Sequence, residues 1–82
     1  MTRVTLISRA GCHLCEVAEQ ALDRIAAGEW TRLDVDSSPE LAGEYGDRVP
    51  VVLLDGKEHG YWKVEEERLL RDIAKPPGAP RL

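Results

Sequence analysis

Two cysteines, Cys12 and Cys15, are the residues whose type and spacing most clearly allow chemistry in this chain. They lie in the segment Cys12-His13-Leu14-Cys15, directly after an apolar strand-like run and at the start of a helical pattern. In a helix, Cys15 lies one turn beyond Cys12, so the two sulfur atoms can reach each other. The free N–H groups and the positive dipole end of a helix start favour a thiolate at the first position. This placement is typical of a redox dithiol.

The cysteine count restricts the chemistry further. The 82 residues contain no third cysteine, so neither a four-cysteine metal site nor a disulfide framework can form. The two thiols must pair with each other, react, or act with a second molecule. Two buried structural thiols are the plain alternative, which the position at a strand–helix junction disfavours.

Length and composition predict one small globular domain. Hydrophobic residues make up 43%, enough for a folded core, while a net charge of -4 without a basic stripe disfavours nucleic-acid binding. No apolar run reaches the roughly 20 residues of a membrane span, and residues 1–7 are too short and too alternating for a signal peptide. We therefore expect a cytoplasmic monomer that binds neither nucleic acid nor membrane. In that compartment a disulfide is transient or catalytic rather than structural.

Hydrophobic periodicity predicts the elements that position the cysteines. The expected order is β-α-β-α-β-β-α, over residues 4–7, 12–25, 31–36, 39–45, 49–54, 57–62 and 65–74. This order predicts an α/β fold with a four-stranded mixed sheet flanked by helices. The domain is expected over residues 1–75, followed by a flexible, proline-rich tail over residues 76–82.

Local signals predict where these elements begin, end and face. Ser38 reads as an N-cap before Pro39, Asp55-Gly56 as a two-residue hairpin turn, and Gly28 as a helix stop. Trp30 is interpreted as core or sheet cover, and His59 as an exposed hairpin residue. The helical residues expected to face the core are Leu14, Val17, Ala18, Ala21, Leu22, Ile25, Leu41, Ala42, Tyr45, Leu69, Leu70 and Ile73.

The dithiol and the pair Val49-Pro50 at the third strand, in this element order, resemble the thioredoxin superfamily, most closely its small glutaredoxin-like proteins. The resemblance covers residues 3–74, with further matching pieces in residues 8–12, 33–36 and 45–52. It implies a thioredoxin-like fold and a thiol–disulfide oxidoreductase, with Cys12 as nucleophile and Cys15 as resolving thiol. It also implies a cis Val49–Pro50 bond beside the dithiol, which exposes backbone groups for an extended peptide or thiol tripeptide.

Four further side chains are candidates for substrate binding beside this dithiol. Arg9 adds positive charge near Cys12, or is an ordinary surface charge. His13 stabilises the thiolate when protonated, or faces solvent with little effect. Tyr61 and Trp62 match the stretch that binds ligand in the family, although sheet packing is the commoner use of such rings.

The departures from the family concern the partner. His13-Leu14 replaces the usual Pro-Tyr of glutaredoxins, and the family's Gly-Gly-acid stretch is replaced by residues 59–63. We therefore expect the partner to be a protein disulfide, as substrate, or a low-molecular-weight thiol other than glutathione, which can also serve as reductant. We expect no metal and no cofactor besides the redox disulfide. Two alternatives stay open: a binding module without turnover, and a soft-metal carrier like the small copper chaperones, whose element order is βαββαβ.

Overall fold

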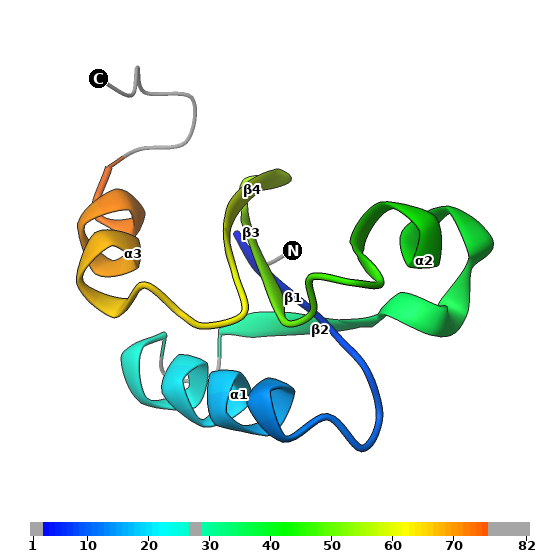
Figure 1. Ribbon diagram of the computed structural model, residues 1–82. Helices are drawn as coiled ribbons and strands as arrows, with labels where there is room; N and C mark the ends of the chain where they lie inside the picture. Colours follow the sequence, from blue (N-terminus) through cyan, green and yellow to red (C-terminus); the bar gives the residue numbers. More distant parts are fainter. Residues whose placement is uncertain (1–2, 27–28, 76–82) are drawn as a thin grey trace.

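The computed structural model describes residues 3–26 and 29–75 (Figure 1). The observed elements are β1 (Val4–Ser8), α1 (His13–Ile25), β2 (Trp30–Asp34), the 3-10 turn η1 (Val35–Ser37), α2 (Pro39–Tyr45), β3 (Val51–Leu54), β4 (Lys57–Tyr61) and α3 (Glu66–Ile73). No helix within the described ranges is long and apolar enough to cross a membrane. The expected helix stop at Gly28 and the expected tail over 76–82 lie outside the described residues.

The four strands form one mixed sheet in the order β2-β1-β3-β4. Strand β1 pairs in parallel with β2 and antiparallel with β3, and β3 pairs antiparallel with β4. The predicted four-stranded mixed sheet and its element order are therefore confirmed, with η1 as the one addition. The two central strands, β1 and β3, are the most apolar, as expected for strands covered on both faces.

Neighbouring residues of β1 pack on opposite faces of the sheet. Leu6 packs with Leu22 of α1 and Leu69 of α3 in one core cluster. Ile7 packs with Val35 in a second cluster, against which α2 packs. Figure 1 shows the resulting layers, with α1 and α3 covering one face of the sheet and α2 the other. Packing against the core therefore holds the dithiol helix α1 on the sheet, and the intrinsic helix propensity of its residues is not what fixes its position.

Local turn and cap signals have the predicted conformations. The Ser38 side chain accepts a hydrogen bond from the Leu41 N–H at 3.2 Å, and Pro39 is the first residue of α2. Asp55 and Gly56 have φ of 53° and 82°, as a two-residue type I′ hairpin requires. The structure confirms these boundaries. The sequence could predict them because each depends only on residues a few positions apart.

The apolar faces of α1 and α3 are narrower than the sequence predicts. Leu14, Val17 and Leu70, expected in the core, are 52%, 48% and 47% exposed. Val17 directly precedes the buried Ala18, and Leu70 directly follows the buried Leu69, so each is rotated by about 100° from the buried residue beside it. Leu14 lies on the buried side of α1 but in its first turn. The other nine residues expected to face the core are buried or half-buried.

Three strands are shorter than predicted, and one of them, β4, ends at Tyr61, one residue before its predicted end. Strand β2 ends at Asp34 because the Asp34 side chain accepts the Asp36 N–H at 2.8 Å, which caps the following turn η1. Val35 is fully buried, and it lies in this turn instead of the predicted strand. Strand β3 begins at Val51, two residues after the predicted start.

The prediction that His59 is exposed is wrong. The residue is 7% exposed, and its Nε2 lies 2.8 Å from Oδ2 of Asp72 on α3. Strand alternation directs this side chain of β4 toward the face that α3 covers, where the carboxylate satisfies its buried nitrogen. The interpretation of Trp30 as sheet cover is confirmed, since the half-buried ring packs against the core and its Nε1–H donates to Asp23.

Candidate active site

The strand register brings the predicted site residues to one edge of the sheet. Ile7, near the end of β1, pairs with Val51 at the start of β3, and Val51 pairs with Tyr61 at the end of β4. The loop of residues 9–12, which leads from β1 into α1, therefore leaves the sheet at the edge where Pro50 enters it. The dithiol, the proline and the aromatic pair share this end of the molecule although up to 50 residues separate them in the chain.

Cys12 is the N-cap residue of α1. Its Sγ accepts a hydrogen bond from the Cys15 N–H at 3.2 Å, and its carbonyl accepts the Glu16 N–H at 3.1 Å. Gly11, with φ of 76°, makes the left-handed turn that aims the half-buried thiol at the helix start. Sulfur thus occupies the place of a capping oxygen, where helix N–H groups and the dipole favour its thiolate form.

Cys15 lies one helical turn deeper and is 1% exposed. Burial, together with the hydrogen bond to Cys12, raises the pKa of the Cys15 thiol to about 11, while the backbone of Arg9 opposes the rise. Neither cysteine is in a disulfide in this structure. The pair therefore consists of an accessible thiol at the helix cap and a protected, protonated thiol behind it.

This asymmetry predicts strongly selective alkylation. At about pH 7, we expect iodoacetamide to label Cys12 at least about a hundredfold faster than Cys15, because a thiol with a pKa near 11 is almost entirely protonated there. The labelling of Cys15 should rise about tenfold for each added pH unit, since a raised pKa delays ionisation. Timed labelling followed by peptide mass mapping measures both rates. Faster labelling of Cys15 would reverse the roles assigned to the two thiols.

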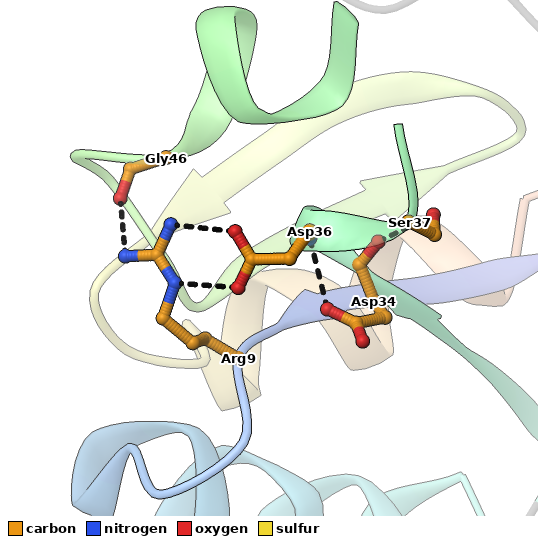
Figure 2. Close-up of polar contacts among 5 residues, drawn as sticks. All are labelled: Arg9, Asp34, Asp36, Ser37 and Gly46. Carbon is orange, nitrogen blue, oxygen red and sulfur yellow. Dashed lines mark hydrogen bonds and ion pairs between the residues drawn. The ribbon is translucent and has the colours of Figure 1, made fainter. Parts of the chain in front are cut away.

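Arg9 carries a charge that is already paired. Figure 2 shows its guanidinium against Asp36, with Nε and Nη2 donating to the two carboxylate oxygens at 3.0 and 3.2 Å, and with Nη1 donating to the Gly46 carbonyl at 3.3 Å. The hydrogen bonds to Asp36, with its negative charge, raise the pKa of Arg9, and the nearby Cys12 and Cys15 contribute in the same direction. Asp36 was not among the predicted site residues, because its partner lies 27 positions away and no local pattern connects them.

His13 takes the solvent-facing one of its two predicted orientations. Its side chain is 86% exposed, and Nδ1 lies 4.0 Å from the Glu16 carboxylate on the next turn. A charge pair this exposed is worth little.

Val49 and Pro50 are joined by a cis peptide bond, as the family resemblance implies. Pro50 is buried, and Val49 is half-buried against the core cluster around Ile7. The Pro50 carbonyl accepts a hydrogen bond from the Trp62 N–H at 2.7 Å. This bond connects the proline directly to the residue that follows β4.

Tyr61, the last residue of β4, and Trp62, the next residue, are more exposed than sheet packing, the commoner use expected for them, would leave them. They are 45% and 55% exposed, and their rings meet edge-on with centroids 4.9 Å apart. The backbone turns here, since Trp62 has φ of 68°. The two rings therefore form an exposed aromatic pair beside Pro50.

A pocket of about 430 Å³ opens on the other side of the dithiol, toward β2. Its lining includes Cys12 and Arg9, as well as charged residues that were not predicted as site residues: Glu16, Glu19, Arg32 and Asp34. Arg32 of β2 forms an ion pair with Glu19 of α1 within this lining. The sequence holds no local signal for it, because only the parallel pairing of β1 and β2 brings β2 beside the dithiol loop.

The architecture and the Cys-X-X-Cys pair at the β1–α1 junction define a glutaredoxin-like protein with the thioredoxin fold. A solved structure of target protein XcR50 from X. campestris superposes with a TM-score of 0.73 at 36% identity, covering 89% of this chain and 99% of that one. The holo form of glutaredoxin C1 from Populus tremula x tremuloides shares the fold, with a TM-score of 0.61 at 21% identity over 89% and 87% of the two chains.

Sequence comparison assigns the family. The glutaredoxin-like domain (DUF836) matches residues 3–74. An uncharacterized protein of Mycobacterium tuberculosis is 48% identical over 89% of this chain and 84% of its own length. The chain belongs to the glutaredoxin-like domain family.

Proposed function

We propose that the protein is a thiol–disulfide oxidoreductase that uses Cys12 and Cys15 as its redox pair. The observation that carries the proposal is the asymmetry of the two thiols: Cys12 caps a helix and lines a pocket, and Cys15 is buried one turn behind it. A nucleophile needs access and a favoured thiolate, whereas a resolving thiol must be protected until it is used.

The proposed reaction has two exchange steps. The Cys12 thiolate attacks one sulfur of a substrate disulfide, forms a mixed disulfide with it, and releases the other sulfur as a thiolate. Cys15 then loses its proton and attacks Cys12 Sγ, which forms the Cys12–Cys15 disulfide and releases the second substrate thiolate. Two electrons pass from the protein to the substrate, and the protons of the dithiol end on the released thiols. Two equivalents of a low-molecular-weight thiol return the protein disulfide to the dithiol.

The helix start contributes to the first step. The Cys15 N–H and the helix dipole stabilise the Cys12 thiolate that attacks the substrate disulfide. We further propose that a protein disulfide or a small thiol other than glutathione is the partner of a monomeric enzyme in the cytoplasm, where reducing thiols are abundant.

Turnover tests the proposal. The purified protein should catalyse the reduction of 2-hydroxyethyl disulfide and of insulin by dithiothreitol, measured against the uncatalysed rate. A protein that binds such disulfides covalently without turnover would be a binding module. A protein that exchanges with neither substrate would not be an oxidoreductase.

Glutathione should reduce the oxidised protein slowly. The aromatic pair Tyr61–Trp62 projects beside Pro50, in the stretch where the family resemblance implies small glycines and an acidic residue. Each polar group of the tripeptide that loses a partner costs about 1–3 kcal/mol, so the rate should be roughly 5- to 150-fold below that of a dithiol glutaredoxin assayed in parallel.

A single variant distinguishes steric exclusion of glutathione from a low reactivity of the protein disulfide toward all thiols. Trp62→Gly restores a small residue at a position whose φ of 68° glycine accepts without strain. The variant should react faster with glutathione and at an unchanged rate with 2-mercaptoethanol, in stopped-flow measurements of the oxidised protein. If glutathione reduced the oxidised wild-type protein as fast as it reduces the glutaredoxin assayed in parallel, the exclusion of glutathione would be contradicted.

A further inference from the structure

The Arg9 guanidinium is the positive charge nearest the dithiol in sequence, and the structure holds it in a fixed pair. Both oxygens of Asp36 accept its hydrogen bonds, and the Gly46 carbonyl accepts a third. The carboxylate is itself held in place, because the turn that carries it is closed by the Asp36 N–H on Asp34 and by the Ser37 hydroxyl on the Asp34 carbonyl (Figure 2).

Arg9 is also joined to the dithiol loop. Its carbonyl accepts the Cys12 N–H at 3.3 Å, and its side chain and Cys12 line the same pocket. Cys12 and Cys15 both contribute to raising the pKa of Arg9, in the direction expected of negative charge near a guanidinium. A change in the net charge of the Arg9–Asp36 pair should therefore be felt at Cys12.

We propose that Asp36 is a positioning residue of the dithiol: it holds Arg9 in a neutral pair, which prevents the guanidinium from acting as the counterion of the Cys12 thiolate. The inference deepens the proposed function, since it names the group that sets the reactivity of the nucleophile. It is a property of this chain's tertiary structure, because Asp36 reaches Arg9 only through the pairing of β1 with β2.

The direction of the effect follows from charge. With both groups present, the pair has no net charge. Without the carboxylate, one positive charge remains near Cys12 and favours its thiolate; without the guanidinium, one negative charge remains and disfavours it. The other charged groups that line the pocket with Cys12 are Glu16 and Glu19 of α1 and Arg32 and Asp34 of β2, with the exposed His13 adjacent in the chain, and they stay constant among the variants.

The test is the rate of Cys12 alkylation by iodoacetamide as a function of pH, followed by peptide mapping. In Asp36→Asn the midpoint should move to lower pH, with the rate on the acidic side rising about threefold and the alkaline plateau falling about threefold, since thiolate nucleophilicity falls as ionisation becomes easier. Arg9→Gln should move the midpoint the opposite way, and the double variant should return close to wild type.

Matched variants separate charge from structure. Asp36→Glu keeps the carboxylate and should stay near the wild-type profile. Glu40→Gln removes an exposed negative charge from the first turn of α2 and should leave the profile unchanged. Salt at about 0.5 M should shrink the shift in Asp36→Asn, because the Arg9 charge left without its partner is partly exposed and is therefore screened.

Two results would overturn the proposal: an unchanged midpoint in Asp36→Asn, or shifts in the same direction for Asp36→Asn and Arg9→Gln. If Asp36→Asn does not fold, Arg9→Gln still tests the charge coupling. A pH profile of Cys12 alkylation that is unchanged in Arg9→Gln would refute it. Alkylation needs no turnover, so a failed charge effect is distinguishable from a failed oxidoreductase assay.

Discussion

Replacing Cys12 with serine should lower the rate of disulfide reduction by at least about a thousandfold, because a hydroxyl at this position cannot form the attacking anion near neutral pH. Cys15→Ser should behave differently. It retains the thiol that caps α1, so it should still attack the substrate disulfide, but the mixed disulfide should accumulate because nothing resolves it.

The two variants serve as controls for each other. Each variant removes a single sulfur atom, and the two positions lie one helical turn apart. Circular dichroism should report the same fold for both variants. Intact mass measurements after mixing with 2-hydroxyethyl disulfide distinguish the species: Cys15→Ser should carry the adduct on Cys12, and Cys12→Ser should carry little. An adduct that accumulates on Cys15 in Cys12→Ser would show that the buried thiol is the nucleophile.

Leu69→Ala should destabilise the protein by about 2–5 kcal/mol. Leu69 is the fully buried residue by which α3 enters the core cluster that also contains Leu22 of α1, so its removal leaves a cavity between both helices and the sheet. A small domain has about 5–15 kcal/mol of total stability or less, so the loss is a large share of it. The melting temperature should fall by about 10 °C or more.

The next residue in the chain is the matched control. Leu70 is 47% exposed, and Leu70→Ala should change the free energy of unfolding by no more than about 0.5 kcal/mol. Chemical denaturation of both variants beside the wild type measures the difference. Equal losses for Leu69→Ala and Leu70→Ala would contradict the packing of α3.

The elements and their order were predictable because local interactions determine them. The cap at Ser38, the hairpin turn at Asp55 and Gly56, and the start of α1 at the dithiol each depend on residues within about four positions. For the same reason, the relation between Cys12 and Cys15 was visible in the sequence: one helical turn separates them, and a helix start provides the donors for the first thiol.

Side-chain environments depended instead on contacts between distant segments. The order β2-β1-β3-β4 brings Asp36 to Arg9, and it brings Arg32 beside the dithiol loop. The docking of α3 buries His59 against Asp72, although the hairpin pattern alone predicted exposure. A periodic pattern defines which residues share a face of an element but not how much of that face a neighbour covers. The dithiol itself is therefore a property of the sequence, whereas its charge partners exist only in the folded chain, because long-range strand pairing decides which side chains meet.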